Sequence, residues 1–228
     1  MANRLPLSVD EWYHCYNRGV DKQRIFRSPV DYQRFMALLF LANGDRPTHL
    51  SNLKDARLAS IVEHLGDRRG NPLVEIGAYA LMPNHVHFIL KEIRDGGIAA
   101  FMQKIFTGYT MYFNKKNERT GALLAGTFKS KHLHDDEYFK HAVSYVHLNP
   151  AELYETNWKS GVADMHALEN RLCAYPYSSL PDFYAASSRR PERFIISSSV
   201  FDLYDSIPSF SNVLADAQAY YSEVNIKV

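Results

Sequence analysis

The sequence predicts an α+β fold, in which amphipathic helices pack on an antiparallel sheet. In some segments the apolar residues alternate, as in strands. In others they recur every three or four positions, as in helices, and the two kinds of segment are interspersed along the chain. Two strand-like segments meet at Pro83-Asn84, a turn signal that joins antiparallel strands. The 228 residues are 46% hydrophobic and 22% charged, which is enough to bury the core of one domain.

The first part of the chain predicts one strand and one helix. Residues 11–20, EWYHCYNRGV, form an aromatic strand that ends in glycine. The helix begins after Ser28, a suitable N-cap, with Pro29 in its first position, and ends near Gly44. Residues 45–72 are polar and mixed, and we expect an insertion with one short helix there.

A hairpin and a second helix are predicted next. Residues 73–83 (LVEIGAYALMP) and 84–92 (NHVHFILKE) are the two strands of the hairpin. Residues 97–121 carry apolar and aromatic side chains at helical spacing, and Gly121 lies beyond the end of that helix.

A fourth strand at 126–134 and a helix at 135–154 follow, and Pro150 breaks or kinks this helix. The order β-α-β-β-α-β-α predicts a ferredoxin-like antiparallel sheet with two helices on one face and a further helix after the last strand. We assign this domain to residues 1–155. Residues 156–228, rich in Ser, Pro and Tyr, are expected to be an extension without a core of its own.

Several classes of protein are disfavoured. The N-terminus has no apolar run of signal-peptide length, and the chain offers no 18 consecutive apolar residues for a membrane span. Two cysteines, Cys15 and Cys173, do not make a disulfide framework. The expectation is therefore a cytoplasmic protein with no membrane partner.

Charge is unevenly distributed although the net charge is only +1. Residues 97–134 contain six basic residues and one acid, whereas residues 135–169 contain seven acids and two lysines. A basic surface of this kind suits a polyanion. Charge alone favours the simpler interpretation of solvated faces.

Two histidines alternate in the strand ALMPNHVHFIL. His85 and His87 share a strand face because side chains repeat every second residue. Such a pair is more often structural than catalytic, but it also offers two neutral imidazoles to one metal ion from a rigid element.

The predicted last helix favours the metal interpretation. His141, Tyr145 and Asn149 follow one another at intervals of four and lie on one stripe of the helix. If the helix lies beside the hairpin strand, Asn149 supplies an oxygen ligand and His141 is an alternative ligand or acid–base group.

Tyr145 is then a candidate nucleophile for phosphoryl transfer. A tyrosine hydroxyl has a pKa of about 10 and is a poor nucleophile by itself. A metal that binds the scissile phosphate would assist its attack. Taken alone, Tyr145 is better explained as a core or interface tyrosine, as most tyrosines are.

The motifs LMPNHVHFIL, ERTGALLAGTFKS and YVHLNPAELY resemble those of the REP-associated tyrosine transposases. These belong to the HUH single-tyrosine transposase superfamily, named for its His-hydrophobic-His motif. The early segment YHCYNRGVDKQRIF is similar to the first strand of that family, so the resemblance covers about residues 11–154.

This resemblance implies an enzyme that cuts and rejoins single-stranded DNA beside hairpins. His85 and His87 would bind Mg²⁺ or Mn²⁺, with Asn149 as the third ligand. Tyr145 would form a 5′-phosphotyrosine intermediate. Relatives work as monomers or as dimers, and a homodimer is one expectation.

Five basic residues are candidate contacts to DNA: Arg18, Lys115, Lys116, Lys129 and Lys131. Arg18 shares a face of the first strand with His14 and Tyr16, which point to the site or into the core. Lys129 and Lys131 share a face of the fourth strand, where a merely solvated edge is as good an explanation.

Three alternatives remain at this point. The same chemistry could serve replication initiation or plasmid mobilisation. A domesticated, non-catalytic protein could bind hairpin DNA or RNA. A metal hydrolase for small molecules would use water as its nucleophile and would not need Tyr145.

Overall fold

The computed structural model describes residues 7–47, 57–184 and 190–224. The strands are β1 (Trp12–Arg18), β2 (Val74–Met82), β3 (His85–Glu92) and β4 (Lys129–Leu133). The helices are α1 (Pro29–Ala42), α2 (Leu58–Leu65), α3 (Gly97–Lys116), α4 (Asp136–Leu148), α5 (Met165–Cys173), α6 (Leu180–Tyr184) and α7 (Phe210–Val224). None of these helices is long and apolar enough to cross a membrane.

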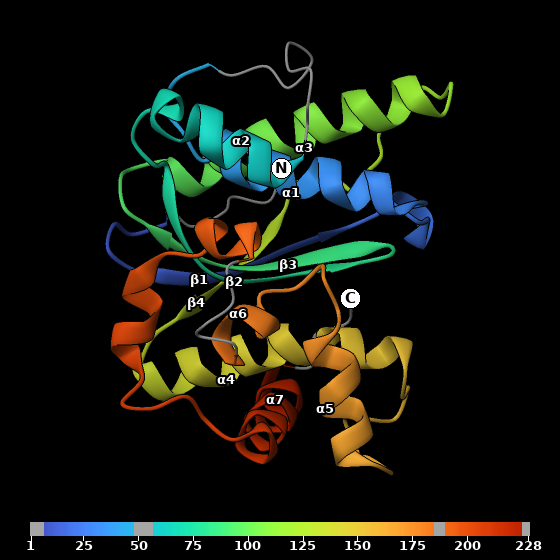
Figure 1. The fold of residues 1–228 in the computed structure, drawn as a ribbon, viewed down its shortest axis with the longest axis vertical. Helices are drawn as coiled ribbons and strands as arrows, with labels where there is room; N and C mark the ends of the chain where they lie inside the picture. The colour runs from blue at the N-terminus through green and yellow to red at the C-terminus, as the bar shows by residue number, and fades with distance from the viewer. Residues whose placement is uncertain (1–6, 48–56, 185–189, 225–228) are drawn as a thin grey trace.

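The strands form one antiparallel sheet in the order β2-β3-β1-β4. Helices α1 and α3 cover one face of this sheet, and α4 lies on the other face together with α5, α6 and α7 (Figure 1). The predicted ferredoxin-like α+β fold is therefore confirmed. In the polar segment 45–72, α2 is the expected short helix, while residues 48–56 lie outside the described residues.

The pairing of β1 with β3 decides which side chains share the α4 face. Tyr16 lies opposite His87, and Arg18 lies opposite His85. Side chains of directly opposed residues project from the same face of a sheet. All four residues therefore lie on one face, as alternation along each strand predicts.

The opposite face holds the aromatic core under α1 and α3. The Phe88 ring stacks with the Phe35 ring, with centroids 6.3 Å apart. The hydroxyl of Tyr109 donates to the carbonyl oxygen of Ile25 at 2.6 Å, so this buried polar group has a hydrogen-bond partner. Tyr109 and Phe113 are both buried here, as their helical spacing predicts.

A buried carboxylate joins the start of α1 to the end of α3. Asp31 accepts hydrogen bonds from the backbone nitrogens of Arg27 and Ser28, at 2.8 and 2.9 Å. Its other oxygen accepts from Lys116 Nζ at 2.6 Å and from the Tyr112 hydroxyl at 3.0 Å. Burial raises the pKa of Asp31, but these donors outweigh it and the pKa is lowered.

Much of the described chain beyond residue 156 packs on the α4 side of the sheet, whereas Pro191–Ile195 contacts α1 and α2. Leu81 N donates to the carbonyl oxygen of Tyr177 at 2.9 Å, so the chain near Tyr177 runs along the outer edge of β2. Trp158 and Tyr220 are fully buried among the other core residues. The helix α7 packs along α4 and was not predicted. The domain boundary at residue 155 stays a prediction.

We expect Lys116→Met to lower the free energy of unfolding by about 1–2 kcal/mol, because it leaves the buried Asp31 carboxylate with one donor fewer. Lys115→Met is the matched control: no ion pair of Lys115 is found among the described residues, and a change within about 0.5 kcal/mol is expected. Urea unfolding at pH 7 measures both. Equal losses in the two variants would show that the bond to Asp31 contributes nothing.

Candidate functional site

Four residues of β3, of α4 and of the position that directly follows α4 come together between the sheet and the helix. His85 and His87 project from β3, with ring centroids 5.0 Å apart. Tyr145 lies on α4, and its ring centroid is 5.8 Å from that of His87. Asn149 directly follows α4, and its Oδ1 lies 3.4 Å from His85 Nε2. We call these four residues the candidate site.

Hydrogen bonds at the rim orient His85. The Nδ2 group of Asn84 faces the carbonyl oxygen of Lys22, so Asn84 Oδ1 faces His85 Nδ1, at 2.7 Å. An amide oxygen only accepts, and His85 Nδ1 is therefore the protonated nitrogen. Burial lowers the pKa of His85, so the ring is neutral at pH 7 and its Nε2 carries a lone pair.

Asn149 is held so that its oxygen faces this lone pair. Its Nδ2 donates to the carbonyl oxygen of Tyr145 at 3.0 Å, which turns Oδ1 toward His85 Nε2. Two acceptors thus face each other at 3.4 Å with no proton between them. A cation that both can ligate would satisfy this arrangement.

His87 offers a third atom. Its Nε2 is buried and has no hydrogen-bond partner among the described residues. Burial, and then the neighbouring His85, His14 and Lys159, lower the pKa of His87 well below its ordinary value, so it is neutral. Two imidazole nitrogens and one amide oxygen fit a divalent metal ion. No group of three or more His, Cys, Asp or Glu in the described ranges is arranged to do so.

Tyr145 is buried beneath the C-terminal helix. Its side chain is 2% exposed. Its ring centroid lies 5.3 Å from that of Tyr220 and 6.4 Å from that of Tyr221. Burial raises the pKa of Tyr145, so its hydroxyl is protonated at neutral pH. The rings of Tyr220 and Tyr221 on α7 pack against the Tyr145 side chain.

His141 does not join the candidate site, although it shares a stripe of the helix with Tyr145. Its Nε2 lies 3.7 Å from a carboxylate oxygen of Asp216 on α7, and the Ser144 hydroxyl bonds to the same carboxylate. This geometry favours a contact between α4 and α7. A role as ligand or acid–base group stays a prediction.

Two residues that sequence reasoning left unassigned or missed contact the site. His14 on β1 lies with its Nε2 at 2.8 Å from His87 Nδ1, and its Nδ1 at 3.0 Å from the Tyr220 hydroxyl. Strand alternation placed His14 on the correct face. Nothing in the sequence pointed to Tyr220, because the contact joins residues that are 206 positions apart.

The basic candidates divide between the two faces of the sheet. Lys129 and Lys131 lie on β4, on the α4 face. Lys129 Nζ is 5.9 Å from the centroid of the Tyr16 ring, and Lys131 Nζ is 5.8 Å from that of Tyr220. Arg18, half-buried, faces His85 across the strand pair. These three can meet a phosphate near the site.

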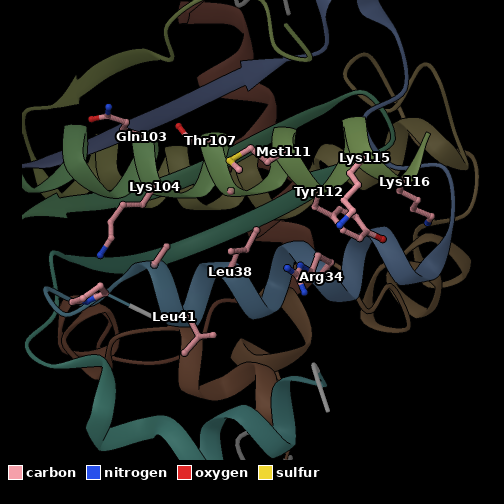
Figure 2. Close-up of a pocket in the computed structure, with 13 residues that line it drawn as sticks. Arg34, Leu38, Leu41, Gln103, Lys104, Thr107, Met111, Tyr112, Lys115 and Lys116 are labelled. Atoms are coloured by element: carbon pink, nitrogen blue, oxygen red, sulfur yellow. The ribbon is translucent and has the colours of Figure 1, made fainter. Parts of the chain in front are cut away.

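Lys115 and Lys116 lie on the far face, at a groove of about 950 Å³ between α1 and α3 (Figure 2). Arg34 and Lys104 also line this groove, above a floor that includes Leu38. Because Lys116 already pairs with Asp31, Lys115 is the freer of the two for an outside partner.

Comparisons with known proteins support the fold. A solved structure described as "Structure of the REP associates tyrosine transposase bound to a REP hairpin" is similar, with a TM-score of 0.51 and 14% sequence identity. The match covers 92% of this chain and 97% of that chain. A search of curated proteins found no match.

A family model gives the family. The model described as IS200-like transposase matches residues 38–155, which include all four residues of the candidate site. This match and the similar structure agree with the resemblance that the sequence motifs predicted. Since the matched residues make up more than half of the sequence, the chain belongs to the family of IS200-like transposases.

Proposed function

We propose that this transposase cuts and rejoins single-stranded DNA beside hairpins, with a divalent metal ion and a 5′-phosphotyrosine intermediate on Tyr145. The observation that carries the proposal is the pair of facing acceptors, His85 Nε2 and Asn149 Oδ1, 3.4 Å apart on the elements that also hold His87 and Tyr145. Hairpin DNA is the inferred partner because the similar solved structure is described as bound to a REP hairpin.

His85, His87 and Asn149 would hold Mg²⁺ or Mn²⁺. The ion, when bound, polarises the scissile phosphate and stabilises the charge that develops on it. The protein fixes the ligands beforehand: the contact with Asn84 fixes the His85 ring, and the bond to the Tyr145 carbonyl fixes Asn149. Such outer partners set the direction of each lone pair.

The Tyr145 oxygen attacks the phosphorus of one phosphodiester, and a new bond forms between them. The bond from phosphorus to the 3′ oxygen breaks, the phenolic proton passes to solvent, and the departing 3′ oxygen takes up a proton from solvent. The products are a 5′-phosphotyrosine and a free 3′-OH. Attack on the phosphotyrosine by another 3′-OH reverses the chemistry and joins new ends, so no external energy source is required.

We expect Tyr145→Phe to abolish the covalent protein–DNA adduct and to leave hairpin binding intact, because only the nucleophilic oxygen is removed. Labelled single-stranded hairpins from the DNA that flanks the gene would be incubated with the protein and Mn²⁺ and run on a denaturing gel. Tyr109→Phe, which removes an equally buried hydroxyl on the opposite face of the sheet, should still form the adduct.

Two other results would contradict the proposal. Cleavage that persists in Tyr145→Phe would make water the nucleophile. Hairpin binding without an adduct in the unaltered protein would favour a non-catalytic binding protein. This second candidate is supported by one observation, the deep burial of Tyr145 under Tyr220 and Tyr221.

For the metal site, we expect Asn149→Leu to weaken Mn²⁺ binding by more than tenfold, since loss of an outer partner alone costs about 10–100-fold. Asn149→Asp retains an oxygen of similar reach and should bind Mn²⁺ at least as tightly as the unaltered protein. The loss of the free-Mn²⁺ resonance during titration, followed by electron paramagnetic resonance, gives each affinity. Equal affinities in Asn149→Leu and the unaltered protein would exclude Asn149 as a ligand.

A further inference from the structure

A chain of three buried rings runs from the C-terminal helix to the candidate site. The Tyr220 hydroxyl lies 3.0 Å from His14 Nδ1, and His14 Nε2 lies 2.8 Å from His87 Nδ1. All three side chains are 0% exposed, so no water competes for these bonds. The far nitrogen of the last ring, His87 Nε2, is the unpartnered atom that faces the site.

Only two arrangements of protons satisfy this chain when both imidazoles are neutral, because each ring then has one N–H and one lone pair. In the first, Tyr220 donates to His14, His14 donates to His87 Nδ1, and the proton of His87 is on Nε2. In the second, His87 Nδ1 donates to His14, and His14 Nδ1 donates to the Tyr220 oxygen. Only the second leaves a lone pair on His87 Nε2.

We propose that His14 and Tyr220 are positioning residues that keep the proton of His87 on Nδ1 and its Nε2 lone pair directed into the candidate site. The inference rests on the proposed function, since it assigns a purpose to that lone pair. It extends the site to β1 and to α7, neither of which supplies a proposed ligand. The helix α7 is thereby needed for metal binding, although it lies far from the ligands in the sequence.

The hydroxyl oxygen of Tyr220 matters here because it can accept a hydrogen bond from His14 Nδ1. When His14 Nδ1 carries the proton, the Tyr220 oxygen is its partner among the described residues. With that oxygen, this arrangement leaves only the His87 Nε2 lone pair unpaired, whereas the other arrangement leaves the proton on His87 Nε2 without an acceptor among the described residues. Unpaired buried N–H groups are the rarer of the two in proteins. Without that oxygen, each arrangement leaves one buried N–H and one lone pair unpaired, so the preference for a proton on His87 Nδ1 is lost. Removing the hydroxyl should therefore move the proton of His87 toward Nε2, where it competes with a metal ion.

We expect Tyr220→Phe to weaken Mn²⁺ binding by about tenfold, as for other outer partners of histidine ligands. Long-range ¹H–¹⁵N spectra of the metal-free protein should show the His87 proton on Nδ1 in the unaltered chain and a shift toward Nε2 in the variant. Tyr109→Phe is the matched control: it also removes a buried tyrosine hydroxyl but should change neither measurement.

His14 provides a second test in case Tyr220→Phe does not fold. His14→Gln can accept the His87 Nδ1 proton through its amide oxygen and should retain most of the Mn²⁺ affinity. His14→Leu cannot accept, and its affinity should fall by about tenfold or more. If His14 had only a structural role, the Mn²⁺ affinity of His14→Gln would fall as far as that of His14→Leu.

The outcomes separate this inference from the proposed function. Equal Mn²⁺ affinity in Tyr220→Phe and the unaltered protein, with an unchanged tautomer, overturns the positioning role and leaves the metal site standing. If the unaltered protein binds no Mn²⁺, the metal site fails, and the ¹⁵N spectra still decide: a proton on Nδ1 that moves in Tyr220→Phe supports the role, and a proton on Nε2 overturns it.

Discussion

The pairing of β1 with β3 fixes the geometry on which the candidate site depends. Tyr16 opposes His87 and Arg18 opposes His85, and the same pairing brings His14 within 2.8 Å of His87. A slip of β1 by one residue would turn His14, Tyr16 and Arg18 to the other face of the sheet. That face is packed with aromatic rings under α1 and α3, where a polar ring would be left without partners. The hydrophobic core thus enforces the position of the polar residues.

Burial then decides the chemistry of those polar residues. An imidazole that is removed from water binds a proton less readily, and the pKa of His14 falls to about 3 through burial and then through the charge of Lys131. Neutral rings are metal ligands and hydrogen-bond partners, whereas charged rings would repel both a cation and one another. The same burial raises the pKa of Tyr145. One environment therefore favours lone pairs on the histidines and a retained proton on the tyrosine.

The sequence predicted the parts of the site whose spacing is local. Alternation placed His85 and His87 on one face, and the four-residue interval placed Tyr145 and Asn149 on one stripe. The Pro83-Asn84 signal gave the hairpin, and the motifs gave the family. The partners of these residues were harder to find, because the bond between His14 and Tyr220 and the bond from Lys116 to Asp31 join positions 206 and 85 residues apart. Such contacts depend on how the elements pack.

The distribution of cations over the two faces bears on the path of the DNA. A phosphate at Tyr145 would lie on the α4 face of the sheet, the face that also carries Lys129 and Lys131 of the edge strand β4. The cations of the α1/α3 groove are separated from that point by the sheet itself, and Lys116 among them is already paired with Asp31. A net charge of only +1 is compatible with binding a polyanion if a few cations stand close to the reacting phosphate. We therefore propose that Arg18, Lys129 and Lys131 offset the phosphate charge at the site, and we expect Lys115 to act only on DNA that extends around the edge of the sheet.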